Sequence, residues 1–292
     1  MRYGLHLANG VSVTDPAVLK DVCQLAEELG YESILIGDHV LPPRKINSKF
    51  PLPVEDPQIH RYQDQHWPDC FAMLGFMASI TSSVRLGTSV FIVPYRHPAV
   101  TAKMIATLDK LSNGRIIAGI GSGWIEEEFN FLNAPFAERG RMTDEYIEVM
   151  KALWTDAHPR IEGRFVTIDR DVNFGPYPVH KPHPPIWVGG NTTAALRRVV
   201  RCADGWQPAG LMPDVIGQKL DQLRSLMAEA GRDFSQLEIT CMVGTDATEA
   251  VADVFDKLGA HVLYGLVSAT DEETPQLFAE IRRYAETMSQ RG

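Results

Sequence analysis

The stretch from Val84 to Phe129 constrains the fold of this chain more than any other. It contains two β-branched, apolar segments, one ending at Pro94 and the other at a cluster of glycines, and a helical pattern joins them. Such a strand–helix–strand unit predicts two parallel strands linked by a crossover. Parallel sheets bind ligands at the carboxyl ends of their strands. The segment therefore predicts both a fold class and the end of the sheet where chemistry takes place.

The same alternation runs through all 292 residues. We expect strands at 2–8, 33–37, 84–93, 115–121, 185–190, 205–209, 237–244 and 261–268, and helices at 16–30, 68–82, 98–112, 138–155, 192–203, 213–230, 247–258 and 273–288. Strict alternation implies parallel strands with right-handed crossovers. Eight units are what a closed (β/α)8 TIM barrel requires, and we predict that fold as one domain over residues 1–292. An open doubly wound sheet is the alternative.

Two segments exceed a minimal barrel. Residues 41–66 contain five prolines and no apolar period, and they follow the second strand, so we place them at the catalytic end. Residues 156–184 contain a short hairpin pattern at 160–168 and then a stretch rich in proline and histidine. Long loops in compact domains are usually functional or disordered.

Composition limits the classes of partner. The net charge of −9 and the pI of about 5.5 argue against broad binding to nucleic acid or to anionic membranes, although a local basic pocket for a phosphate stays open. The chain has no apolar run near the ~18 residues of a membrane span and no signal-peptide core at its start. The four cysteines form no C-x-x-C pair, so we expect buried free thiols and a cytoplasmic protein.

Polar residues at strand ends are the first candidates for catalysis. Asp38-His39 ends the second strand, and histidine can donate a hydrogen bond or move a proton near neutral pH. His6 lies inside the first strand, on its smaller and more polar face, from which it could reach a pocket in the barrel. His66-Trp67 borders the proline-rich insertion and could form a pocket wall.

Two glycine-rich turns are candidates for binding a cofactor. Gly119-Ile120-Gly121-Ser122-Gly123 resembles a dinucleotide fingerprint but has Trp124 where the third glycine belongs, which disfavours nicotinamide binding. The second turn follows a strand and precedes a helix, so its bare amides and the positive helix end favour a phosphate. Its residues are Val188, Gly189, Gly190, Asn191 and Thr192.

Other polar patterns favour structural interpretations. Arg197, Arg198 and Arg201 fit a solvated helix face better than an anion site, and the acidic run 126–128 suits the first turn of a helix, although one of the three could face the site. His180 and His183 have metal-ligand spacing but no carboxylate nearby, so we expect no metal.

Taken together, these motifs resemble the bacterial luciferase-like superfamily of flavin- and F420-dependent oxidoreductases. The most specific are LGTSV at 86–90, RHPAVTAKMIATLDKLSNGR at 96–115, GIGSGWIEEEF at 119–129 and PPIWVGGNT at 184–192, followed by ADGW at 203–206. The resemblance covers essentially the whole chain and is closest to the branch that uses coenzyme F420.

The resemblance implies a barrel that holds an isoalloxazine-type ring at the carboxyl ends of its strands. A non-proline cis peptide would lie at Ser89-Val90, His39 would lie beside the ring with Asp38 before it, and 121–123 and 189–191 would be the cofactor loops. One position departs from the family pattern. Trp124 stands where the F420-dependent sugar-phosphate dehydrogenases carry a catalytic glutamate, which puts that chemistry in doubt and indicates a more apolar pocket.

The resulting hypothesis is an F420-dependent oxidoreductase that transfers a hydride to or from a small organic substrate. The alternative is an FMN-dependent monooxygenase supplied with reduced flavin by a partner reductase, and a third reading is a flavin-binding barrel without turnover. F420 differs from FMN by a polyglutamate tail, for which the three arginines at 197, 198 and 201 are candidate ligands. Relatives usually form homodimers, so we expect a dimer.

Overall fold

The computed structural model describes residues 1–7, 14–49, 67–210, 212–267 and 274–290. Parallel strands form one ring in the order β3-β2-β1-β11-β10-β9-β8-β5-β4, and an additional β3–β5 pairing closes it. The strands are β1 (Arg2–Leu7), β2 (Ser33–Ile36), β3 (Arg85–Thr88), β4 (Phe91–Ile92), β5 (Ile116–Gly121), β8 (Ile186–Gly189), β9 (Gly205–Gln207), β10 (Glu238–Gly244) and β11 (Val262–Val267). The predicted (β/α)8 barrel is confirmed, and the closing pair excludes the open sheet.

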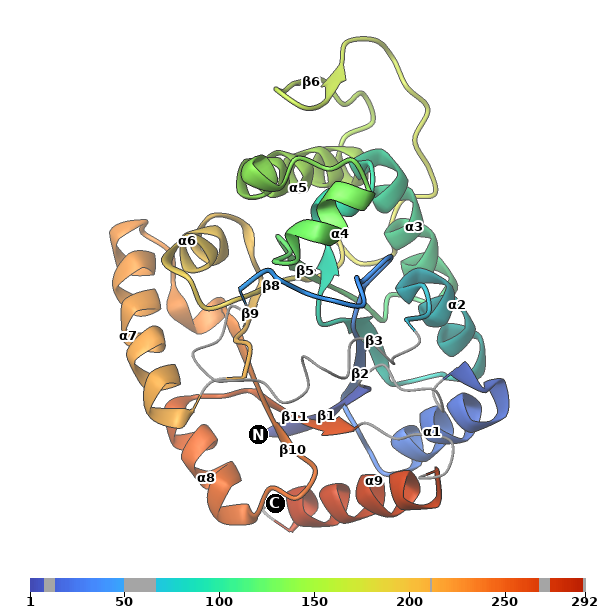
Figure 1. Ribbon diagram of the computed structural model, residues 1–292, viewed down its shortest axis with the longest axis vertical. Coiled ribbons are helices and arrows are strands. Elements are labelled where there is room, and N and C mark those ends of the chain that lie inside the picture. Colours follow the sequence, from blue (N-terminus) through green and yellow to red (C-terminus); the bar gives the residue numbers. More distant parts are fainter. Residues whose placement is uncertain (8–13, 50–66, 211, 268–273, 291–292) are drawn as a thin grey trace.

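Helices surround the ring, as Figure 1 shows. They are α1 (Pro16–Glu28), α2 (Cys70–Ile80), α3 (Pro98–Leu111), α4 (Glu126–Phe131), α5 (Arg139–Thr155), α6 (Thr193–Cys202), α7 (Pro213–Glu229), α8 (Glu249–Leu258) and α9 (Thr274–Ser289). Their starts follow from the sequence: Asp15 caps α1 ahead of its first-turn proline, and Asp69, Thr192 and Thr248 cap α2, α6 and α8. The short helix α4 is an addition to the eight that the periodicity predicts.

The third strand differs most from its prediction. Instead of one strand over 84–93, the structure has β3 and β4, separated by a cis peptide bond between Ser89 and Val90. β3 pairs with β2 and β5, whereas β4 pairs with β5 further along. The amide of Ser89 donates to the carbonyl of Ile36 at 2.7 Å. The bulge expected from the family pattern is therefore present at the predicted position.

Large side chains fill the amino-terminal end of the barrel interior. Leu35, Ile117, Trp187, Val262 and Tyr264 form a buried inner cluster there, separate from the core between strands and helices. Glycines make room for it: a methyl group at position 4 would overlap the Tyr264 ring, and one at position 205 would overlap Trp187. This end is thus closed by packing.

Ion pairs and hydrogen bonds cover the same end. The guanidinium of Arg85 lies 5.2 Å from the ring centroid of Trp187 and pairs with Glu32. Glu32 also pairs with Arg2, and the hydroxyl of Ser33 bonds to both Glu32 and the Tyr264 hydroxyl. Any ligand of the barrel must therefore enter from the opposite, carboxyl end.

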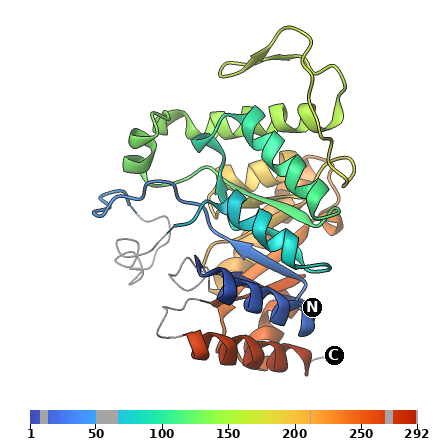
Figure 2. The same cartoon turned by 90° about the vertical axis from the view of Figure 1, so that its right-hand side faces the viewer.

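The second insertion contains the predicted hairpin. β6 (Ile161–Glu162) and β7 (Thr167–Ile168) pair antiparallel and extend away from the barrel (Figures 1 and 2). The carboxylate of Glu145 on α5 accepts the backbone amides of residues 164–166 and so attaches the hairpin to the helix ring. Of the first insertion, residues 41–49 are described and contain neither helix nor strand, and 50–66 lie outside the described residues.

Two sequence predictions concern solvent and membrane exposure. Cys23, Cys70 and Cys241 are buried free thiols as expected, and Cys202 is half-buried. Within the described ranges no helix has both the length and the apolar character that crossing a bilayer requires.

Candidate active site

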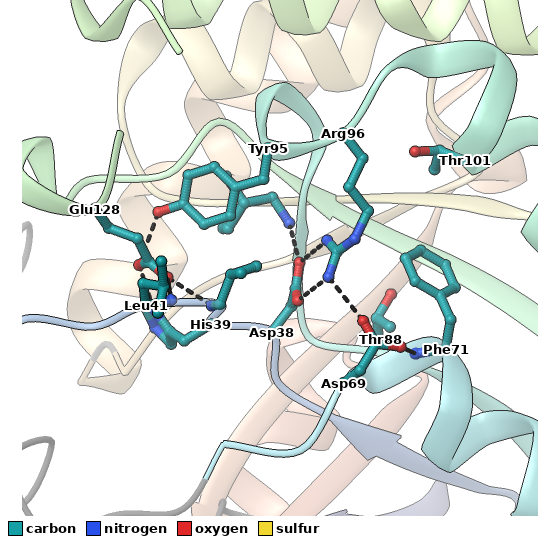
Figure 3. Close-up of polar contacts among 12 residues, drawn as sticks. Asp38, His39, Leu41, Asp69, Phe71, Thr88, Tyr95, Arg96, Thr101 and Glu128 are labelled. Atoms are coloured by element: carbon teal, nitrogen blue, oxygen red, sulfur yellow. Dashed lines mark hydrogen bonds and ion pairs between the residues drawn. The ribbon is translucent and has the colours of Figure 1, made fainter. Parts of the chain in front are cut away.

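A histidine and a buried carboxylate meet where β2 ends. His39 follows β2, and Glu128 comes from α4, 89 residues further along the chain. Figure 3 shows the His39 Nδ1 atom facing the Glu128 carboxylate, with 2.7 Å between Nδ1 and Oε2. A carboxylate only accepts, so Nδ1 carries the shared proton, and in the neutral ring Nε2 is then the basic nitrogen. The pair fixes both the orientation and the tautomer of the imidazole.

Glu128 is fully buried, and each of its oxygens has two donors. Oε2 accepts from His39 and from the Tyr95 hydroxyl at 2.9 Å, while Oε1 accepts the amides of Val40 at 2.6 Å and Leu41 at 3.0 Å. Burial raises the pKa of Glu128, but these hydrogen bonds and the neighbouring imidazole outweigh it, so the pKa lies below its ordinary value. Glu128 is therefore a carboxylate at neutral pH.

The other acidic residues of α4 hold the same insertion. Glu127 accepts the amides of Asn47 and Ser48 and the Ser48 hydroxyl, and that hydroxyl accepts the amide of Glu126 at 2.9 Å. Sequence reasoning favoured a helix-dipole role for 126–128 and kept one site-facing residue as an option. The structure shows that Glu128 faces His39, and that Glu127 and the Glu126 amide hold residues 47 and 48.

Asp38 has a different environment from its neighbour. Its carboxylate is buried and accepts both terminal nitrogens of Arg96 at 2.7 and 2.9 Å, together with the amide of Ile92 at 3.0 Å (Figure 3). Arg96 also reaches Asp69 and lies over the ring of Phe71. A bidentate pair of this kind fixes geometry. Asp38 thus ties the end of β2 to β4 and α2, and Arg96 is a contributor that the sequence patterns did not single out.

The aromatic residues predicted for the pocket lie in two places. Trp67 packs edge-on against the His39 ring, with 4.4 Å between the ring centroids. Trp124 is half-buried in the segment between β5 and α4. His66 lies outside the described residues. Trp67 thus lies beside His39. The predicted pocket wall at His66-Trp67 and the substrate contacts of Trp124 stay predictions.

The glycines after β5 and β8 accommodate the bulge. A methyl group on Gly121 would come within 2.5 Å of one methyl of Val90, and a methyl group on Gly189 would come within 2.7 Å of the other. One on Gly119 would overlap the carbonyl oxygen of Thr88. Gly123 has φ +75° and faces Phe129 and Ile92. Much of the glycine pattern thus lets the Ser89-Val90 bulge protrude into the barrel.

His6 contacts the bulge from the other side. Its Nε2 lies 3.2 Å from the carbonyl oxygen of Ser89, so Nε2 is the donor. Burial lowers the pKa of His6 more than the backbone hydrogen bonds raise it, which favours the neutral ring with Nδ1 as an acceptor. The predicted position of His6 inside the barrel agrees with this contact.

The predicted phosphate turn is braced by its neighbours. Asn191 exchanges two hydrogen bonds with the backbone of Ala209, at 2.7 and 3.0 Å, and Thr192 caps α6 through the amide of Ala195. Gly190 has φ +107°, and its carbonyl accepts the indole N–H of Trp206. The side chain of Val188 packs in the outer core, so only its backbone could face a ligand.

The arginines of α6 mainly serve the scaffold. Arg198 is buried and pairs with Asp144 on α5, and Arg201 pairs with the same carboxylate. Arg197 is exposed. The structural interpretation is thus supported for two of the three, although Arg198 is buried and not solvated. No group of three His, Cys, Asp or Glu side chains suited to a metal ion occurs among the residues that the structure describes.

Several buried polar atoms at the carboxyl end of the barrel lack a partner, which indicates whether a flat, polar ligand would fit there. Among the described residues, His6 Nδ1, Ser122 Oγ and both carboxamide atoms of Gln207 are buried without a hydrogen-bond partner. Natural structures rarely leave such atoms unpaired unless a ligand or water completes them. They lie at the same end of the barrel as the bulge and the braced turn, so the residues present fit a heteroaromatic ring with a phosphate-bearing tail.

Comparison with known proteins agrees with this geometry. The family model of luciferase-like monooxygenases matches residues 1–291. The chain belongs to the luciferase-like monooxygenase family. An uncharacterised protein of Mycobacterium tuberculosis strain H37Rv is 33% identical over 234 residues, which are 80% of each chain.

Two relatives with described activities differ in cofactor. An F420-dependent glucose-6-phosphate dehydrogenase of Nakamurella multipartita is 30% identical over 82% of this chain and 67% of its own length. An FMNH2-dependent dimethylsulfone monooxygenase of Pseudomonas putida is 29% identical over 74% of this chain and 58% of its own. The family thus contains both F420- and FMN-dependent members.

The fold has close structural neighbours. The crystal structure of the monooxygenase RslO1 from Streptomyces bottropensis aligns with a TM-score of 0.82 over 100% of this chain and 99% of its own, at 18% identity. At 18% identity this match supports the barrel fold alone and carries no conclusion about chemistry.

Proposed function

We propose that this protein is an F420-dependent oxidoreductase that transfers a hydride to or from a small organic substrate. The observation that carries the proposal is the His39–Glu128 pair, a histidine fixed by a fully buried carboxylate at the carboxyl end of the barrel. The similarity to an F420-dependent dehydrogenase over 82% of the chain supports the choice of cofactor.

The bound coenzyme supplies hydride chemistry, and the residues of this chain supply position and proton control. The bulge at Ser89 and Val90 would support one face of the ring, and Ser122 would contribute a hydroxyl near it. The turn at 189–192 and the start of α6 would hold the phosphate. Asp38, through Arg96, fixes the strand end that carries His39.

His39 would hold or move a proton at the substrate. Because Glu128 accepts the Nδ1 proton, Nε2 is the atom that can accept one from a substrate hydroxyl or, once protonated, donate one to a carbonyl oxygen. Trp67 and Trp124 would line the pocket with apolar surface and limit water. This lining favours an uncharged organic alcohol or carbonyl compound over a sugar phosphate.

An FMN-dependent monooxygenase is the second candidate. The relative from Pseudomonas putida supports it, and the same turn could hold the phosphate of FMN. That activity would require a partner reductase. The scaffold role of Arg198 and Arg201 weakens one argument for the F420 tail, so Arg197 is the remaining candidate of the three. A barrel without turnover would have no need for a carboxylate that orients a histidine.

Titration of the apoprotein distinguishes the two cofactors. Oxidised F420 and FMN are added separately, and cofactor fluorescence is followed at fixed ionic strength. We expect saturable F420 binding that is at least about tenfold tighter than FMN binding, a difference of roughly 1.4 kcal/mol. Tight FMN binding with no response to F420 would refute the proposal in favour of the second candidate. The same samples, analysed by light scattering, test the expected homodimer.

A further inference from the structure

Gln207 is an unpaired polar side chain inside the barrel. It is the last residue of β9, its exposed fraction is 5%, and neither Oε1 nor Nε2 has a partner in the part of the chain that the structure describes. The preceding residue, Trp206, points into the outer core and donates to the Gly190 carbonyl. Side chains alternate along a strand, so Gln207 points into the barrel.

Its neighbours place Gln207 one layer above the closed end. Gly205, two residues earlier, faces Trp187 of the inner cluster. Gln207 is paired in register with Gly189, which faces Val90, and a methyl group on Gly119 would lie 2.9 Å from Gln207 Oε1. The carboxamide is therefore in the barrel interior, next to the Ser89-Val90 bulge.

A second unpaired group reaches the same region from β1. His6 donates Nε2–H to the Ser89 carbonyl, and its Nδ1 is buried without a partner among the described residues. The interior beside the bulge thus offers an acceptor from His6 and one donor and one acceptor from Gln207. A ligand that pairs with the carboxamide must carry a donor next to an acceptor on one edge.

We propose that Gln207 is a ligand-binding residue whose carboxamide pairs with the imide edge of the cofactor ring, donating Nε2–H to a ring carbonyl and accepting the ring N3–H. This edge is common to F420 and FMN, so the inference rests on the proposed function but not on the choice between them. It also explains why Gln207 has no hydrogen-bond partner among the described residues: the pairing groups belong to the ligand.

The test separates a ligand contact from a structural one. We compare wild type, Gln207→Leu and Gln207→Met, with Gln24→Leu on the exposed face of α1 as the matched control. Thermal unfolding of each apoprotein is measured first. Because Gln207 has no partner among the described residues, its substitution should leave the melting temperature unchanged or raised, since an apolar group then replaces an unpaired buried amide.

Binding of F420 and of FMN is then measured by fluorescence titration. For the cofactor that wild type binds, we expect both Gln207 variants to weaken binding about 10- to 100-fold, since two hydrogen bonds are lost and ring polar groups stay unpaired. Wild type should also reject a ring methylated at N3, and the Gln207 variants should discriminate about tenfold less. Gln24→Leu should match wild type throughout.

The outcomes are distinct. The assignment is overturned, while the proposed function stands, if both Gln207 variants keep the wild-type cofactor affinity or the wild-type discrimination against the N3-methylated ring. Internal water would then satisfy the hydrogen bonds of the carboxamide. Loss of apoprotein stability in both variants also overturns it, in favour of a structural role. If wild type binds neither cofactor, the proposed function fails, and this inference fails with it.

Discussion

The two ends of the barrel interior both contain buried polar groups, but these groups are mostly paired at one end and mostly unpaired at the other. At the amino-terminal end, Tyr264, Ser33, Glu32 and Arg85 satisfy one another, and the Trp187 indole N–H is the atom left without a partner among the described residues. At the carboxyl end, three side chains retain unpaired buried atoms. Among the described residues, the closed end leaves one indole N–H unpaired, whereas the carboxyl end leaves unpaired atoms on three side chains, which a ligand could satisfy. Stability and binding should therefore respond separately to substitutions at the two ends.

The largest effect should come from His39→Ala. Removing the candidate acid–base group should lower turnover about 10²- to 10⁴-fold. Because buried Glu128 also loses a donor, the free energy of unfolding should fall by about 1–2 kcal/mol, and turnover is compared under conditions where both proteins are folded. Hydride transfer is followed as loss of reduced-cofactor absorbance, with a substrate found by screening alcohols and carbonyl compounds. His158→Ala, at an exposed position just before the hairpin, is the matched control. Unaltered turnover in His39→Ala would contradict the assignment.

Gly119→Ala tests the fit of the bulge. The added methyl group would overlap the Thr88 carbonyl, and backbone cannot yield cheaply, so the free energy of unfolding should fall by about 3 kcal/mol. Urea unfolding measures it. Gly75 lies inside α2, and a methyl group there would have its nearest neighbour, a Leu108 methyl, at 3.7 Å. Gly75→Ala should therefore be neutral or stabilising. Equal stability of the two variants would show that the bulge tolerates a side chain at position 119.

Much of this arrangement could be predicted from sequence, and the limits have a physical cause. Strand and helix positions agree within about two residues because hydrophobic period and capping are local signals. The glycines near 121 and 189 were predicted as cofactor loops; their close protein neighbour is Val90, and their contacts with a cofactor stay a prediction. Partners such as Glu128 and His39 are 89 residues apart, and no local pattern distinguishes a buried carboxylate from one that favours a helix dipole. Gln207 belongs to no motif.

Glu128→Gln tests the buried carboxylate at the carboxyl end of the barrel. An amide replaces one acceptor with a donor, so the His39 and Tyr95 donors or the two backbone amides lose a partner. We expect a loss of about 2 kcal/mol in the free energy of unfolding at pH 7.

The same variant has a defined pH signature. The pKa of Glu128 is lower in the folded chain than in the unfolded one, so its stabilisation is present above its ordinary value of 4.5 and is lost as pH falls through the folded pKa. The gap between wild type and Glu128→Gln should therefore narrow in acid. Glu126→Gln, an exposed change, is the control. A gap independent of pH would contradict this account.

Tyr264→Phe should have the smallest effect and should be confined to the closed end. It removes one hydroxyl, whose partner Ser33 keeps Glu32 as an acceptor, so we expect a loss of about 1 kcal/mol in unfolding free energy. The cofactor dissociation constant should not change. A shift in that constant would show that the two ends of the barrel are energetically coupled.

The acidic run of α4 has a consequence for engineering new specificities. Carboxylates of this short helix accept backbone amides of residues 40–41 and 47–48, at the start of the proline-rich insertion. One of them also sets the tautomer of His39. A library that randomises the insertion to admit other substrates should therefore keep residues 126–128 fixed. Shortening or shifting α4 would remove the acceptor that sets the His39 tautomer and, at the same time, release residues 40–41 and 47–48.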